Sequence, residues 1–187
     1  MIAMSALAVD SLDAIWQLLE SIPDPEIPVV SIRELGILRD VRRTAQGTVE
    51  VVITPTYSGC PAIGQMEDDI RAALKVADID ATIITQLAPA WTTDWMTASA
   101  HQKLREYGIA PPQHLVEAGK VIQFAPKSIS KSLYSTKAGG QLDSKNVLCP
   151  RCNSANTTET SHFASTACKA LYKCLSCLEP FDYFKPY

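Results

Sequence analysis

The chain has 187 residues, which is enough for one ordinary domain and a smaller additional module. Apolar residues make up 47% and charged residues 20%, and no apolar run has membrane-spanning length, so the composition excludes a membrane protein. The formal charge of −3 provides no general basic field, which argues against a nucleic-acid binder. The amino-terminal residues lack the basic segment of a secretion signal, so we expect a cytoplasmic protein whose partners are proteins or small molecules.

Two kinds of periodicity alternate along the first part of the chain. Apolar residues that recur every three or four positions predict amphipathic helices, and alternating β-branched residues such as Val49, Val51 and Ile53 predict strands. In chain order we expect a helix from Ser11 to Ser21 that prolines terminate, strands over residues 37–43 and 48–54 joined by a turn at Gln46-Gly47, a helix after Pro61, a strand over residues 81–87, and a helix that Asp94 caps and Gly108 ends.

A change of composition predicts the domain boundaries. Serine, lysine and glycine dominate residues 127–146 without sustained periodicity, which is typical of a flexible connector. We therefore expect a first domain over residues 1–126, a linker over residues 127–146, and a small cysteine-rich module over residues 147–187.

Four cysteines of this module have the spacing of a metal site. Cys149 and Cys152 form one Cys-x-x-Cys pair, and Cys174 and Cys177 form a second pair after 21 intervening residues. Each pair can hold one side of an ion, so the two together predict a tetrahedral zinc ribbon. Iron or an iron-sulfur cluster is the alternative to zinc, and buried or disulfide-linked thiols are the alternative to a metal.

Three further residues of the module bear on this prediction. Asn153 follows the first pair, at a place that often needs left-handed backbone, and asparagine tolerates that conformation. Leu178 stands at the corresponding place of the second pair, which makes its turn less certain. Cys168 is a fifth nearby thiol, which we interpret as a half-buried strand residue and not as an alternative ligand.

Cys60 is the one cysteine of the first domain, and it lies between a predicted strand and a predicted helix. Pro61 suits the first helical position, which would make Cys60 the N-cap. Helix amides would then lower the pKa of its thiol, and Thr56 and Ser58 add hydroxyl groups nearby. The alternative is a small core residue. No histidine or lysine is adjacent to act as a base, so a protease-like dyad has no support.

Several segments together resemble known families. Asp24-Pro25-Glu26 and its continuation to residue 28, with residues 31–37, 56–61 and 66–70, are similar to the iron-sulfur assembly domain shared by SufT and the cytosolic targeting factors. The similarity covers most of residues 10–108. Residues 149–152, 165–174 and 179–185 resemble the PaaD (PaaJ) family of the phenylacetyl-CoA epoxidase system.

The resemblance implies an α+β first domain, with a small mixed sheet packed with helices, followed by a zinc ribbon. It implies an accessory and not a catalytic role beside the other epoxidase subunits, helping to build or deliver the iron-sulfur cluster of the reductase subunit. Cys60 would then be the reactive thiol, with Thr56, Asp24 and Glu26 in support. Zinc would be structural, and iron or an iron-sulfur cluster would be held only transiently. A structural subunit of the same complex and an independent thiol enzyme remain as alternative functions.

Overall fold

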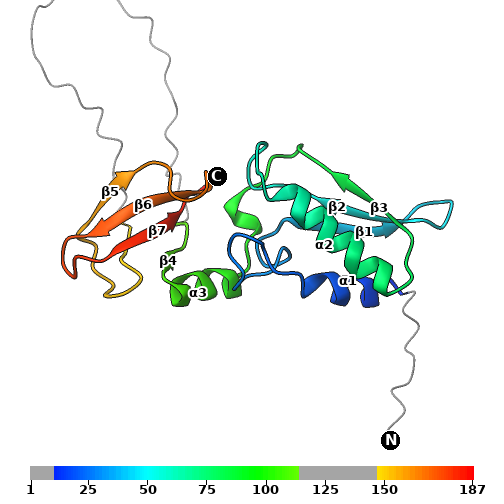
Figure 1. Ribbon diagram of the computed structural model, residues 1–187, viewed down its shortest axis with the longest axis horizontal. Coiled ribbons are helices and arrows are strands. Elements are labelled where there is room, and N and C mark those ends of the chain that lie inside the picture. Colours follow the sequence, from blue (N-terminus) through cyan, green and yellow to red (C-terminus); the bar gives the residue numbers. More distant parts are fainter. Residues whose placement is uncertain (1–10, 114–146) are drawn as a thin grey trace, which may run out of the picture.

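The computed structural model describes residues 11–113 and 147–187, so the predicted linker lies outside the described residues. Within them the chain forms three α-helices and two sheets, one of strand order β1-β2-β3 and one of order β4-β7-β6-β5 (Figure 1). Both sheets contain parallel and antiparallel pairs. The predicted α+β class is confirmed. None of the helices in the described ranges is long and apolar enough to span a membrane.

The first helix, α1 (Leu12–Glu20), begins and ends where the sequence predicts. The Ser11 hydroxyl accepts a hydrogen bond from the backbone N–H of Ala14 at 3.2 Å, which satisfies one of the unpaired amides of the first turn. Ser21 is the C-cap, ahead of the prolines that prevent continuation.

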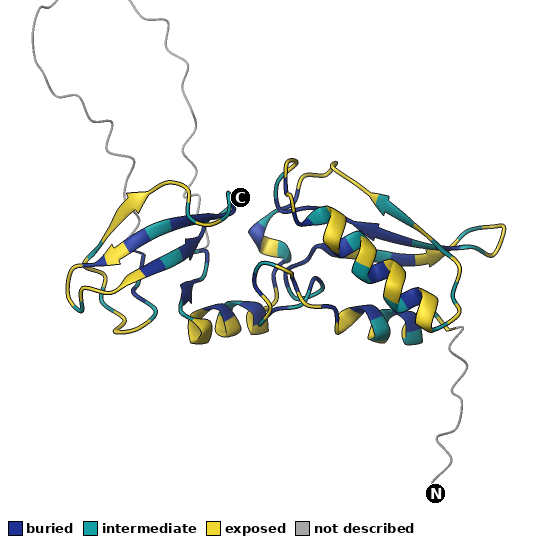
Figure 2. Cartoon of the chain, in the orientation of Figure 1, coloured by how far each residue is buried: buried dark blue, intermediate teal, exposed yellow. Residues whose placement is uncertain are grey.

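The first sheet consists of the predicted hairpin and one further strand. Strands β1 (Leu38–Arg43) and β2 (Val49–Ile53) are antiparallel, and β3 (Ala81–Thr85) pairs in parallel with β2. The helix α2 (Ile63–Val76) connects β2 to β3 and crosses one face of the sheet (Figure 1). Its buried side faces the sheet and its outer side is exposed (Figure 2). This part matches the predicted order of elements.

The next helix begins later than predicted. Asp94 lies in a short 3₁₀ turn (Thr93–Trp95), and Met96 then adopts extended backbone, with φ −72° and ψ 142°, which interrupts the helical path. The cap of α3 (Ala98–Tyr107) is Thr97, whose hydroxyl accepts from the amide of Ala100 at 3.1 Å. The prediction that Asp94 caps this helix is therefore wrong, whereas its end at Gly108, with φ 100°, is confirmed.

The carboxyl-terminal module is a three-stranded antiparallel sheet. A short strand from the first part of the chain adds a fourth strand to it. The strands of the module are β5 (Thr157–Ser161), β6 (Lys169–Cys174) and β7 (Pro180–Phe184). The two residues after the Gly108 cap of α3 form β4 (Ile109–Ala110), which pairs in parallel with β7. One sheet therefore holds strands from both parts of the chain.

Aromatic side chains fill the contact between the two parts. Trp91 is 4% exposed, and its indole N–H donates to the backbone oxygen of Leu35 at 3.0 Å. Its ring centroid lies 6.0 Å from that of Phe184 and 6.1 Å from that of Tyr187, which are distances typical of favourable aromatic pairs. The backbone N–H of Thr93 also donates to the backbone oxygen of Tyr187. These contacts pack the carboxyl terminus against the first part.

Candidate metal centre and thiol site

The four ribbon cysteines come together as the spacing predicts. Their sulfur atoms all lie within 4.8 Å of one another, with 3.7 Å between Cys149 and Cys177 and 3.6 Å between Cys152 and Cys174. Tetrahedral zinc with Zn–S bonds of about 2.3 Å requires sulfurs about 3.8 Å apart. The donor set and its spacing therefore fit one tetrahedral metal ion, and all four protein ligands of a closed site are in place.

The backbone around both cysteine pairs supports this arrangement. Asn153 has φ 59° and Leu178 has φ 67°, so the expectation for Asn153 is confirmed and Leu178 adopts the same left-handed conformation. The amides of Cys177 and Ser176 both lie 3.4 Å from the sulfur of Cys174. These donors, that of Cys177 first, lower the pKa of Cys174 to about 6. A thiolate is the form that a metal binds.

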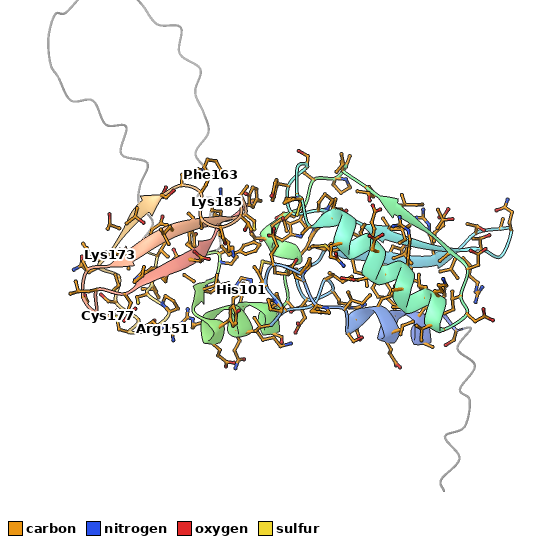
Figure 3. All side chains as sticks on the ribbon, viewed as in Figure 1. His101, Arg151, Phe163, Lys173, Cys177 and Lys185 are labelled. Atoms are coloured by element: carbon orange, nitrogen blue, oxygen red, sulfur yellow. The ribbon has the colours of Figure 1, made fainter. Side chains whose placement is uncertain are left out.

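The metal centre lies at the end of β6 that points away from the first sheet (Figure 3, Cys177). Cys168 directly precedes the opposite end of β6, and six strand residues span about 20 Å at 3.3 Å each. Among the described residues Cys168 does not belong to the close group of metal ligands, as we expected, but it lies in the turn before β6 and not in a strand. It is 4% exposed, more deeply buried than the half-buried position we expected.

Cys60 lies directly before α2, but it is not the N-cap. The helix begins at Ile63 with Ala62 as its cap, two residues later than predicted, because a turn closed by the N–H of Cys60 and the oxygen of Tyr57 at 3.1 Å precedes it. The backbone N–H groups of Ala62 and Ile63 still interact with the Cys60 thiol. The thiol therefore faces the start of the helix as expected.

The pKa of Cys60 is nevertheless raised, and the prediction of a lowered pKa is wrong. Burial of the thiol is the largest cause, and the negative charges of Glu26 and Asp24 add to it. The amides of Ala62 and Ile63 act in the opposite direction but are outweighed. The raised pKa favours the protonated thiol. Before Cys60 can act as a thiolate, a metal cation must displace its proton or a base must accept it.

The acidic segment before the first sheet is organised by Asp24. Asp24 is 5% exposed, and its carboxylate accepts hydrogen bonds from the backbone N–H groups of Glu26 at 2.9 Å and Ile27 at 2.7 Å. Burial raises the pKa of Asp24, and these amides partly offset that effect. Because its oxygen is occupied by the loop, Asp24 shapes the turn, while the side chain of Glu26 extends toward the ribbon.

Glu26 contacts Cys168, a pairing that the sequence does not predict. The sulfur of Cys168 lies 3.9 Å from a carboxylate oxygen of Glu26, although 142 positions separate the two. Thr56, the fourth predicted site residue, is 8% exposed in the loop before Cys60. The structure thus surrounds the Cys60 region with the acidic segment and with one thiol of the ribbon.

Comparison with known proteins shows the family. The family model described as the PaaD zinc beta ribbon domain matches residues 134–185, and the model described as iron-sulfur cluster assembly protein matches residues 12–83. A protein of Escherichia coli (strain K12), named as one of the subunits of 1,2-phenylacetyl-CoA epoxidase, is 45% identical over 184 residues, 97% of both chains. The chain belongs to this PaaD family of epoxidase subunits.

Other relatives match the first part of this family member. An Fe-S protein maturation auxiliary factor of Porphyromonas gingivalis is 33% identical over 48% of the chain and 87% of its own length. The Fe-S protein maturation auxiliary factor YitW of Bacillus subtilis is 34% identical over 44% of the chain and 81% of its own length. A crystal structure of a domain of unknown function, DUF59, from Bacillus anthracis matches 50% of this chain and 90% of its own, at 27% identity with a TM-score of 0.46.

Proposed function

We propose that this chain is an accessory subunit of the multicomponent phenylacetyl-CoA 1,2-epoxidase and assists assembly or delivery of the iron-sulfur cluster of the reductase subunit. The proposal rests on the observation that this one chain is similar to two kinds of protein. The whole length is similar to a protein named as an epoxidase subunit, and the first part is similar to proteins named as Fe-S maturation factors. We keep the cytoplasm as the predicted location.

Cys60 is the residue we assign to the handling of iron or sulfur. Its thiol lies at the start of α2 and interacts with two helix amides, which stabilise a thiolate once a cation displaces the proton. Glu26 supplies a nearby carboxylate, and Asp24 holds the loop that carries Glu26. Thr56 is assigned a supporting place in the same loop as Cys60. No step of epoxidation itself is assigned to this chain.

The ribbon is proposed to hold one structural zinc ion through its four clustered cysteines. Zinc would contribute folding free energy, since apparent binding energies of about 10–16 kcal/mol exceed what so small a core supplies. Four thiolates also suit iron, so elemental analysis decides the metal. We retain the division into a first domain over residues 1–126, a linker over residues 127–146 and the ribbon over residues 147–187 as part of the proposal.

The competing function is a non-catalytic structural subunit of the epoxidase, and Cys60 separates the two. The experiment compares cells that make the wild-type chain, the Cys60→Ser variant, or no chain. The reductase is isolated from each, and its iron and acid-labile sulfide are measured beside the yield of assembled complex. Serine can still accept from the helix amides, so the variant should fold.

The assembly function predicts a normal yield of complex but depleted clusters with Cys60→Ser. Normal clusters with the serine variant and loss of complex only when the chain is absent would establish the structural alternative instead.

A further inference from the structure

The ribbon contributes a thiol to the region of Cys60. The start of β6 faces the first part of the chain (Figure 1), and Cys168 at that end packs into the hydrophobic core of the first part. Its sulfur lies 3.9 Å from Glu26 and 3.0 Å from the hydroxyl of Thr166. A thiol that only filled space would not need to lie against a carboxylate.

Tyr57 places both thiols in the same neighbourhood. This residue lies three positions before Cys60, and its pKa is raised to about 12, first by burial and then by Cys60, Cys168 and Glu26. One phenol therefore interacts electrostatically with two cysteines and one carboxylate, which come from distant parts of the sequence. Cys60 and Cys168 are 9% and 4% exposed, so both thiols are shielded from water.

We propose that Cys60, Cys168 and Glu26 form a second metal site, between the two parts of the chain, that takes one divalent iron ion. Two thiolates and a carboxylate combine soft and hard donors, a set that suits Fe²⁺ and not Mg²⁺ or Ca²⁺. The identity of the metal rests on the proposed function, whereas the grouping of the residues rests on the contact between Cys168 and Glu26 and on the electrostatic interaction of Glu26 with Cys60.

The charges around the site favour a cation. Two lysines lie nearby, but each has a partner: the ammonium of Lys169 lies 3.4 Å from a carboxylate oxygen of Asp182. The ammonium of Lys185 donates to the backbone oxygen of His162 and lies 4.5 Å from the centre of the Phe163 ring (Figure 3).

Because each lysine pairs elsewhere, the negative charge of a carboxylate at Asp24 or Glu26 beside the thiols is not cancelled by a direct ion pair with them. Lys169 acts on Asp24 and Cys168 only at longer range. This charge disfavours a free thiolate and favours one that an ion neutralises.

Binding would be an exchange of protons for the ion. Two Fe–S bonds and one Fe–O bond form, the two S–H bonds break, and both protons leave to solvent, so no electron is transferred. Among the described residues only the ribbon cysteines form a close group of three or more ligand atoms, so the side chains of Cys60 and Cys168 must turn toward the ion. Water or a sulfur atom of a partner can complete the coordination.

The site also gives the ribbon a function. Its metal centre fixes one end of β6, and Cys168 stands at the other end. The ribbon ion would thus position a ligand about 20 Å away without touching the iron.

The test uses the full chain with its ribbon metal bound, kept free of oxygen. Co²⁺ serves as the probe, because bound thiolates give it a sulfur-to-metal charge-transfer band, and Fe²⁺ is then tested in competition. Ribbon zinc is measured before and after, so that exchange into the ribbon is recognised. The variants are Cys60→Ser, Cys168→Ser and Glu26→Gln, with Glu106→Gln, an exposed carboxylate of α3, as the matched control.

We expect one Co²⁺ per chain beyond the ribbon metal, and an excess of Fe²⁺ should displace it, since Fe²⁺ binds a given site more weakly than Co²⁺. Each serine variant should weaken binding at least about tenfold, since losing even an outer partner of a ligand costs that much, and should lose about half of the band. Glu26→Gln should weaken binding with the band retained, and Glu106→Gln should behave as wild type. Absence of a second Co²⁺ site, or equal binding by wild type and Cys168→Ser, overturns the proposal.

The proposed function can fail separately. If Cys168→Ser loses the second Co²⁺ site while the reductase in cells keeps its full iron and sulfide, the metal site stands and its use in cluster assembly does not.

Discussion

Replacement of Asp24 tests whether this residue organises the loop or serves as a charged ligand. Asp24→Ala removes the acceptor of two backbone amides, those of Glu26 and Ile27, in a buried setting. A buried donor left without a partner costs about 1–3 kcal/mol, so the loss of both should lower the free energy of unfolding by about 2–6 kcal/mol. Asp24→Asn keeps an oxygen acceptor and removes a buried charge, so it should cost less than about 1 kcal/mol at pH 7.

The pH dependence of the stability provides a second test of Asp24, because the direction of the change with pH is predicted. Because burial raises the pKa of Asp24 in the folded protein, the protonated carboxyl is the form that folding favours. Its contribution is present below the unfolded pKa of about 3.9 and is lost as the pH rises through the folded pKa.

Urea unfolding of wild type and Asp24→Asn between pH 4 and about 7 should therefore show the asparagine variant gaining relative stability as the pH rises. The reasoning would be refuted if Asp24→Asn were as unstable as Asp24→Ala, or if its stability relative to wild type fell as the pH rises.

Three further predictions concern backbone and metal. Leu178→Asn should tighten ribbon metal binding up to about fivefold in chelator competition, because Leu178 is 65% exposed and its φ of 67° costs about 1 kcal/mol; weaker binding would contradict this. Gly36→Ala should cost at least about 2 kcal/mol in urea unfolding, because a Cβ would lie 2.7 Å from the Cβ and backbone oxygen of Trp95 and φ is 72°; an unchanged midpoint would contradict this. Cys174→Ser should lose the ribbon metal and β5–β7 structure, measured by elemental analysis and amide exchange, while α1 and α2 stay protected; a fully protected ribbon without metal would contradict this.

Local patterns account for the parts of the fold that sequence could predict. The helix α1 has a regular apolar repeat, a serine cap and terminating prolines, so its bounds follow from neighbouring residues alone. The hairpin of β1 and β2 has a glycine turn with φ 87° at Gly47, and α3 ends at Gly108 for the same kind of reason. The Cys-x-x-Cys spacing of the two cysteine pairs predicts a shared metal site, and the four sulfur atoms do lie close together.

Long-range features lay beyond such patterns. Nothing local connects Glu26 with Cys168, because their contact depends on how the ribbon packs against the first part of the chain. The raised pKa of Cys60 has the same origin, since the helix amides are visible in the sequence but burial and the acidic segment are not. The capping of α3 was missed for a different reason, because Asp94 and Thr97 are both good caps and only the extended backbone at Met96 decides between them.

The sequence alone does not decide the role of large aromatic residues such as Trp91, Tyr183 and Phe184. They could have been core residues or contacts to another protein, and large aromatics suit both roles. In the structure Trp91, Tyr183 and Phe184 are at most 6% exposed, so they pack within the chain. The contact between Trp91 and Phe184 helps to hold the ribbon close enough to bring Cys168 beside Glu26, whereas Tyr183 packs inside the ribbon.

The most direct test of the proposed assembly role is transfer to a purified client. Reductase isolated from cells without this chain is incubated, free of oxygen, with iron and sulfide and with either the wild-type protein or Cys60→Ser. Iron, acid-labile sulfide and reductase activity are then followed over time. Our account predicts that the wild-type protein speeds the gain of cluster and activity and that the serine variant does not. Equal gain with both proteins, or no gain above the rate without them, would contradict it.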